Sequence, residues 1–91
     1  MLICIDHDGT YTKDPDLWND FIDLAKKRGH EVICATKRYP GEALDMNETI
    51  GKHCPIIFTC REAKLPILAG EGINPDIWID NDPQGIFYGS I

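Results

Sequence analysis

The sequence predicts one α/β domain, a three-layer sandwich in which helices cover both faces of a mostly parallel sheet of four to five strands. Three observations support this fold class. The chain has 91 residues, the usual size of a single domain. Short apolar runs of strand length alternate along it with segments of helical pattern. Strands that alternate with helices pair in parallel through right-handed crossovers. We therefore treat residues 1–91 as one domain.

Five apolar runs predict the strands. They read MLICID, EVICAT, PIIFT, DIWID and GIFYG, at residues 1–6, 31–36, 55–59, 76–80 and 85–89. The first of them has little polar interruption, which is typical of strands buried on both faces. The last run is short and bounded by glycines, so we expect it at an edge of the sheet.

The first helix is predicted after residue 14. Asp14 suits the N-cap position, Pro15 suits the first helical position, and Asp16 is favourable near the positive end of the helix. Apolar residues recur at helical spacing over the next three turns. A basic last turn followed by Gly29 predicts the end of this helix.

Two further helices are predicted between the later strands. Residues 40–51 have a weak helical pattern that begins at Pro40 and ends at Gly51. Residues 63–72 predict a short helix, in which Pro66 must lie in the first turn because an interior proline would break the hydrogen-bond ladder.

Composition limits the classes of function. The net charge of −6 and the pI of about 4.8 argue against a protein that mainly coats nucleic acid. Cys4, Cys34, Cys54 and Cys60 lack zinc-type spacing and are interpreted as small apolar side chains in a reducing compartment. No apolar run approaches the ~18 residues of a membrane span, and no signal-peptide pattern is present. We expect a cytoplasmic protein without a membrane partner.

Polar side chains lie at the carboxyl ends of the first four predicted strands. The carboxyl ends of parallel strands share one edge of the sheet, and ligands bind beyond that edge. The side chains in question are Asp6 and Asp8; Thr36, Lys37 and Arg38; Thr59, Arg61 and Lys64; and Asp80, Asn81 and Asp82. This concentration predicts a site for a metal ion or a phosphate.

Asp6 and Asp8 are two residues apart, so an extended chain directs both side chains to one side, about 6.5 Å apart. Asp80 adds a third carboxylate at the same edge. Clustered carboxylates are costly without a cation, and oxygen ligands of this kind suit Mg²⁺. The alternative is that Asp6 and Asp8 only cap a turn before Gly9. These residues alone leave both interpretations open.

The ordered motifs resemble those of the haloacid dehalogenase (HAD) superfamily. DHDGT after LICI resembles motif I, and VICAT resembles motif II. Lys64 resembles motif III, and IWIDND resembles motif IV. Together they cover residues 2–82. Motif IV departs from the usual pattern, because Asn81 follows Asp80 and the next acid is Asp82.

The resemblance implies a Rossmann-like HAD core and a Mg²⁺-dependent phosphatase that acts through an aspartyl-phosphate. Asp6 would be the nucleophile, and Asp8 the general acid and base with a raised pKa. Lys64, the third catalytic residue, would neutralise charge on the transferring group. The metal would be held by Asp6, Asp8 (through its backbone carbonyl) and Asp80. The phosphate-binding residues implied are Gly9, Thr10, Thr36, Lys37 and Lys64.

Cap domains in this superfamily are usually inserted after motif I and after the third strand. Here those segments are about residues 9–14 and 60–63, which cannot hold a domain, so we expect a core without a cap. An open site suits a phosphate on something large, such as a protein or a polynucleotide end. The sequence leaves the substrate open among a small molecule, a nucleotide and a macromolecular phosphate. A second copy of the chain could shield such a site, so a homo-oligomer is also expected.

Two other functions remain open. The same fold could serve as a catalytically weak phosphate-binding or interaction module. A receiver-type domain with Asp6 as phospho-acceptor ranks below it, because receivers do not as a rule follow the acceptor with DGT. Basic side chains at the active edge could steer an anion inward, or could simply be solvated.

Overall fold

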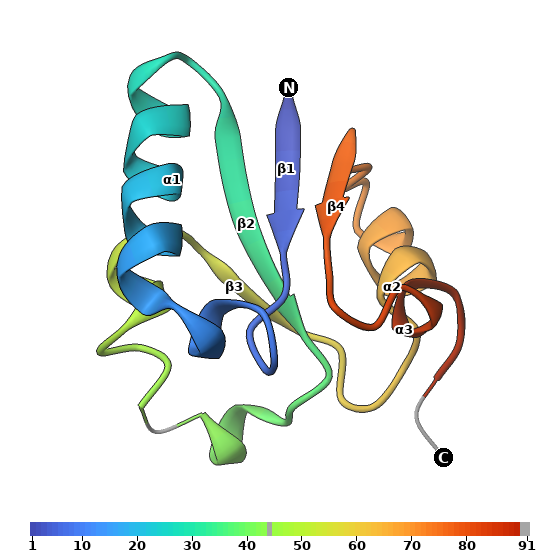
Figure 1. Cartoon of the computed structure of the whole chain (residues 1–91). Helices are drawn as coiled ribbons and strands as arrows, with labels where there is room; N and C mark the ends of the chain where they lie inside the picture. The colour runs from blue at the N-terminus through green and yellow to red at the C-terminus, as the bar shows by residue number, and fades with distance from the viewer. Residues whose placement is uncertain (44, 90–91) are drawn as a thin grey trace.

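The computed structural model describes residues 1–43 and 45–89, which form an α/β fold around an all-parallel sheet of four strands (Figure 1). The strands are β1 (Leu2–Ile5), β2 (Glu31–Thr36), β3 (Ile56–Phe58) and β4 (Ile77–Ile79), in the order β3-β2-β1-β4. The α-helices are α1 (Pro15–Lys27), α2 (Lys64–Gly70) and α3 (Gln84–Phe87). The first four predicted strands are therefore confirmed, three of them with shorter ends.

Alternate side chains of the central strands enter two separate apolar cores. One core contains residues of β1 and β2 together with α1, among them Ile3, Ile5, Val32, Cys34 and Ile22. The other contains the intervening residues together with α2, namely Cys4, Ile33, Ala35 and Leu68. Helices α1 and α2 thus lie on opposite sides of the sheet (Figure 1). Cys4, Cys34 and Cys54 are buried free thiols, as expected from their apolar surroundings in the sequence.

Helix α1 begins and ends as the sequence predicts. The Asp14 carboxylate accepts a hydrogen bond of 3.2 Å from the backbone N–H of Leu17, and Pro15 is the first helical residue. The chain leaves the helix through Gly29, whose φ of +88° favours glycine. Within the described residues, no helix has the length and apolar character needed to cross a membrane.

Replacing Asp14 by alanine should lower the free energy of unfolding by about 1 kcal/mol, because a helix N–H then loses its capping acceptor. Urea unfolding followed by circular dichroism measures this change. Asp20→Ala is the matched control, since it removes the same charge from an exposed position of the same helix. Equal losses in both variants would contradict the capping role.

The helix predicted over residues 40–51 is wrong. The described part of this segment forms two short 3₁₀ turns, Pro40–Glu42 and Ile50–Lys52, joined by irregular turns, and residue 44 lies outside the described part. Proline, glycine, aspartate and asparagine are poor helix formers in this stretch, so its intrinsic preference is weak. Burial decides the conformation instead: Met46 is fully enclosed in the same core as α1.

The edge strand predicted at residues 85–89 is also wrong. Residues Gln84–Phe87 form the short helix α3. At its start, the backbone N–H of Gly85 donates a hydrogen bond to the Asp82 carbonyl. A turn at Asp82 and Pro83 suits a helix start better than a strand. The run also fails to alternate as a strand would, because Gly85 and Ile86 are both buried.

The strand order places β1 between β2 and β4. From β1 the chain proceeds to β2 and β3 on one side, and β4 then pairs on the other side of β1. The boundary between β1 and β4 is therefore the switch point, where parallel sheets of this kind bind ligands. Ile5, the last residue of β1, pairs with Ile79 at the end of β4 and with Cys34, two residues before the end of β2. The carboxyl ends of the three strands therefore lie at the same edge of the sheet.

Candidate active site

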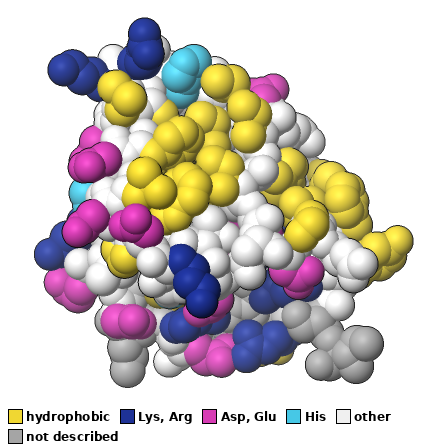
Figure 2. All heavy atoms as spheres, viewed as in Figure 1, with side chains coloured by type: hydrophobic (Ala, Val, Ile, Leu, Met, Phe, Trp, Pro, Cys, Tyr) yellow, Lys and Arg dark blue, Asp and Glu magenta, His cyan; other side chains and the backbone are white. Residues whose placement is uncertain are grey.

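A pocket of about 250 Å³ opens at the carboxyl ends of β1, β2 and β4. It is lined by Asp6, Asp8, Thr36, Lys37, Lys64, Asp80, Asn81, Asp82 and Gly85. Most of the predicted site residues are thus brought together, whereas Gly9 and Thr10 line a neighbouring groove. Figure 2 shows acidic and basic side chains interleaved along the lower edge, below the strand ends of Figure 1.

The centre of the pocket is a buried cluster of two carboxylates and one ammonium group. Lys64 Nζ lies 2.7 Å from Asp6 Oδ1 and 2.7 Å from Asp80 Oδ2. The side chains are 5% exposed for Lys64, 10% for Asp6 and 4% for Asp80, so water screens these contacts weakly. Lys64 is the first residue of α2, where the helix dipole disfavours a cation, and the two carboxylates compensate for that position.

Burial shifts the titration of this cluster. Burial raises the pKa of Asp6 above its ordinary value, and attraction to Lys64 offsets only part of that effect. Burial acts in the opposite direction on Lys64, but the two carboxylates outweigh it, so the pKa of Lys64 is raised. Lys64 therefore remains a cation facing the pocket.

Asp80 is held by both of its oxygen atoms. Oδ2 accepts from Lys64, and Oδ1 accepts a hydrogen bond of 2.9 Å from the backbone N–H of Asp82. Asp82 thus contributes to the site through its backbone amide, while its own side chain lines the pocket wall. This arrangement fixes the carboxylate of Asp80 at the end of β4.

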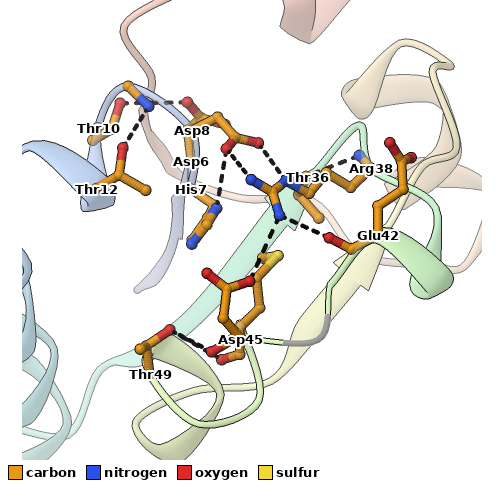
Figure 3. Close-up of polar contacts among 12 residues, drawn as sticks. Asp6, His7, Asp8, Thr10, Thr12, Thr36, Arg38, Glu42, Asp45 and Thr49 are labelled. Carbon is orange, nitrogen blue, oxygen red and sulfur yellow. Dashed lines mark hydrogen bonds and ion pairs between the residues drawn. The ribbon is translucent and has the colours of Figure 1, made fainter.

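The Asp8 side chain, which also lines the pocket, forms a bidentate ion pair with Arg38 (Figure 3). Arg38 donates from Nε to Asp8 Oδ2 at 2.9 Å and from Nη2 to Oδ1 at 2.7 Å. The guanidinium is positioned by the Glu42 carbonyl, which accepts from Nη1 at 2.8 Å, and the Arg38 backbone N–H donates to Thr36 Oγ1 at 3.3 Å. The Asp8 side chain is nevertheless 53% exposed.

The raised pKa expected for Asp8 is wrong in this arrangement. The hydrogen bonds from Arg38 lower the pKa of Asp8, because they favour the charged carboxylate more than partial burial disfavours it. The lowered pKa means that this pairing stabilises the fold at pH values above the ordinary pKa of an aspartate, and that the stabilisation is lost as the pH falls through the lowered pKa.

Arg38→Gln should raise the pKa of Asp8 towards the ordinary value, since the main cause of the lowering is removed. Titration of the carboxyl carbon of Asp8 by NMR measures the shift. Arg61→Gln is the matched control, because Arg61 pairs with Glu42 and not with Asp8. An unchanged Asp8 titration in Arg38→Gln would contradict the assignment of the cause.

The other basic side chains at the rim are also engaged internally. Lys37 Nζ donates to the Tyr88 carbonyl at 2.7 Å. Arg61 contacts Glu42 Oε2 at 2.7 Å and lies over the Tyr39 ring at 5.4 Å from its centroid. These contacts neutralise or fix the cations in the described structure. Steering of an anion by the rim stays a prediction.

His7, which the sequence places beside the site, is buried and stacks on Tyr11 with 5.7 Å between ring centroids. Tyr11 is itself 2% exposed, so it packs in the core. His7 Nδ1 lies 3.4 Å from Asp8 Oδ1 and makes no hydrogen bond to the part of the chain that the structure describes. His7 and Tyr11 thus form a buried aromatic pair in the turn that carries Asp8.

Asn81 joins the turn after β1 to the end of β4. In the amide orientation that satisfies both polar atoms, Nδ2 lies 2.7 Å from Asp6 Oδ2, 3.0 Å from the Asp8 carbonyl oxygen and 3.0 Å from Thr10 Oγ1, so its two hydrogens are shared among three acceptors. The backbone N–H of Asn81 also donates to Thr10 Oγ1, at 3.1 Å. The Thr10 hydroxyl in turn faces Asp6 Oδ2 at 3.4 Å. Thr10 therefore supports Asp6 from behind the pocket.

Gly9 is required by this arrangement for two reasons. Its φ of +84° is a conformation that other residues adopt only with strain. A Cβ atom at this position would also lie 2.5 Å from the nearer polar atom of the Asn81 side-chain amide, which is too close for any real contact. The glycine thus lets the turn approach the Asn81 amide directly.

The oxygen atoms at the site fit Mg²⁺ chemically, but the three predicted carboxylates do not converge. Asp6 and Asp80 share the single ammonium of Lys64, which leaves an excess of buried negative charge. The Asp8 side chain is turned to Arg38, and among residues 1–43 and 45–89 no group of three or more His, Cys, Asp or Glu side chains is arranged around a metal position. The hard donors that remain are the carboxylates of Asp6 and Asp80 and the carbonyl of Asp8.

Two residues at this site have roles that the sequence analysis missed. The pairing of Arg38 with Asp8 cannot be predicted from local spacing, because Arg38 lies in a bend after β2 and Asp8 lies in the turn after β1. Asn81 donates from its side-chain amide in the orientation that gives both polar atoms a partner, and no signal in the sequence distinguishes this orientation from the reverse one.

Comparison of the chain with protein-family models, curated proteins and solved structures found no match.

Proposed function

We propose that this chain is a Mg²⁺-dependent phosphatase, a phosphoric monoester hydrolase on a HAD-type, Rossmann-like three-layer core without a cap domain. The observation that carries the proposal is the pairing of Asp6 with Lys64 in a pocket also lined by Thr36 and Asp80. A phosphate bound in this pocket would then face the Asp6 carboxylate as nucleophile, the Lys64 ammonium as cation and the Thr36 hydroxyl as donor. These are the groups that phosphoryl transfer requires.

The reaction that fits these groups has two steps. In the first, a carboxylate oxygen of Asp6 attacks phosphorus, a bond to the leaving oxygen breaks, and that oxygen takes a proton from Asp8. In the second, Asp8 takes a proton from water, which attacks phosphorus of the aspartyl-phosphate and releases inorganic phosphate. Mg²⁺, held by Asp6, Asp80 and the Asp8 carbonyl, would supply positive charge against the phosphate oxygens.

The chain's own residues support each part of this scheme. Lys64 is buried, cationic and 2.7 Å from Asp6, so it can neutralise charge that develops on the transferring group. Thr36 and Lys37 line the pocket and could donate to phosphate oxygens, while Gly9 and Thr10 shape the turn that holds Asp6. The ion pair between Asp8 and Arg38 must break before Asp8 can donate a proton to the leaving-group oxygen.

The substrate class follows from the openness of the site. Within residues 1–43 and 45–89, the segments after β1 and β3 form only short turns, which leave no room for a cap domain inserted there. An open pocket of about 250 Å³ accommodates the phosphate itself, while the rest of a nucleotide or macromolecule could remain outside. Exposed apolar side chains on α1 and β4, such as Leu17, Leu24 and Ile77, are consistent with a homo-oligomer.

A phosphate-binding module of low activity is the second candidate, and the ion pair of Asp8 with Arg38 favours it. A carboxylate held ionised by a guanidinium is a poor proton donor. In such a module the pocket would bind a phosphate group through Lys64 and Thr36 without turning it over.

Hydrolysis of p-nitrophenyl phosphate, with and without Mg²⁺, distinguishes these functions. The phosphatase predicts metal-dependent release of phosphate by the natural chain and its loss in both Asp6→Asn and Asp8→Asn. Phosphate binding without turnover over a broad panel of phosphomonoesters would reject the enzyme and favour the module. Stable phosphorylation of Asp6 without turnover would indicate a receiver-type domain.

A further inference from the structure

The side-chain amide of Asn81 is hydrogen-bonded to two oxygen atoms that would be ligands of the proposed Mg²⁺. In the amide orientation that gives both polar atoms a partner, its Nδ2 lies 2.7 Å from Asp6 Oδ2 and 3.0 Å from the Asp8 carbonyl oxygen. The other oxygen of Asp6 and one oxygen of Asp80 are taken by Lys64. The metal-binding atoms of the site are therefore already satisfied by N–H donors of the chain itself.

The amide is held firmly in this position. The backbone N–H of Asn81 donates to Thr10 Oγ1 at 3.1 Å, and the same hydroxyl lies 3.0 Å from Nδ2 as a third acceptor. The absence of a side chain at Gly9 leaves space for the amide against the turn, since a Cβ there would meet it at 2.5 Å. Asn81, which follows β4, is thus held against the turn after β1 by its backbone as well as by its side chain.

We propose that Asn81 is a metal-gating residue, whose amide must be displaced from Asp6 Oδ2 and the Asp8 carbonyl before Mg²⁺ can bind. This inference rests on the proposed function, because it concerns the same metal site. A magnesium ion binds oxygen ligands at about 2.0–2.1 Å and competes directly with N–H donors for those oxygen atoms. An aspartate at position 81 would instead attract the ion.

The hydrogen bonds of the Asn81 amide lower the affinity of the site for Mg²⁺, so a higher metal concentration is needed to fill it. A hydrogen bond to a charged group is among the stronger polar contacts in proteins, and its loss opposes metal binding. Removing the amide should therefore raise the affinity for the metal by roughly tenfold. If Asn81 were a ligand, its removal would lower the affinity.

Isothermal titration of the full chain with MgCl₂, and Mn²⁺ binding followed by electron paramagnetic resonance, test the gate. The variants are Asn81→Ala and, as a smaller change that keeps a polar group, Asn81→Ser. Asn74→Ala is the matched control, because this exposed asparagine precedes β4 at the opposite edge of the sheet. We expect tighter binding of both ions by both Asn81 variants, with the greater gain for Ala, and no change for the control.

A second readout is independent of affinity. The side-chain amide signals of Asn81 in a ¹⁵N NMR spectrum should shift as MgCl₂ is added to the natural chain, while those of Asn74 stay in place. Weaker or unchanged metal binding by Asn81→Ala would overturn the gate even if the natural chain is an Mg²⁺-dependent phosphatase. Absence of metal binding in all variants would overturn the metal site itself and the gate with it.

Discussion

Asp6→Asn should abolish phosphate release, with a fall in kcat on the order of 10⁴-fold or more, because the amide cannot attack phosphorus. The change is isosteric, and Lys64 keeps Asp80 as a partner at 2.7 Å, so the pocket should retain its shape. Hydrolysis of p-nitrophenyl phosphate at saturating Mg²⁺ measures the loss. Asp20→Asn is the control, since it removes a carboxylate from the exposed face of α1.

The same variant should be at least as stable as the natural chain at neutral pH. Burial raises the folded-state pKa of Asp6, so folding disfavours the charged form, and stability falls as the pH rises from the ordinary aspartate pKa through the raised one. A neutral asparagine removes that dependence. Urea unfolding at pH 5 and pH 7 checks it: loss of activity together with loss of the fold would contradict a purely chemical role for Asp6.

Lys64→Met should lower the free energy of unfolding by about 3–5 kcal/mol at pH 7, because two buried carboxylates then lose their cation. This is a large share of the ~5–15 kcal/mol typical of a domain. The loss should shrink as the pH falls, because protonation neutralises the buried Asp6 carboxylate in the variant. Phosphatase activity should also be lost, since the pocket no longer holds a fixed cation.

Urea unfolding by circular dichroism measures this change over a pH series. Lys52→Met is the matched control: Lys52 is exposed and pairs with Glu48 at 3.7 Å, so its removal should cost less than 1 kcal/mol, as for surface ion pairs in general. If the double variant Lys64→Met with Asp6→Asn were no more stable than Lys64→Met alone, the uncompensated charge of Asp6 would not be the cause.

Local rules in the sequence were enough for much of the fold. Asp14, Pro15 and Gly29 mark the ends of α1 through contacts within a few residues, so they could be predicted without tertiary information. The strands β1 and β2 were equally clear from their apolar runs. These elements obey local preference and burial at the same time, which is why pattern and structure agree.

The errors lie where tertiary contacts decide the conformation. Residues 40–51 contain apolar side chains at roughly helical spacing, yet the burial of Met46 and the use of the Glu42 carbonyl by Arg38 favour tight turns. Residues 85–89 have strand-like composition, but buried Gly85 fits closely against Lys37 in a helical turn. Neither contact can be derived from the local sequence.

The candidate site shows the same division. The spacing of Asp6 and Asp8 and the positions of Lys64 and Asp80 after the strands predicted which residues meet at the pocket. The direction of the Asp8 side chain depends on Arg38, which β2 brings from thirty residues away. The pKa values of Asp6 and Asp8 depend on burial and pairing, so the sequence could not determine them.

Trapping the phosphorylated intermediate tests the central claim most directly. Asp8→Asn should react with p-nitrophenyl phosphate and Mg²⁺ to accumulate a phosphoryl group on Asp6, because the leaving group needs no acid while hydrolysis needs the Asp8 base. Acid quenching, borohydride reduction and peptide mass spectrometry would then find homoserine at position 6. Turnover by the natural chain with no modification of Asp6 in this variant, or with the label on another residue, would contradict the proposed mechanism.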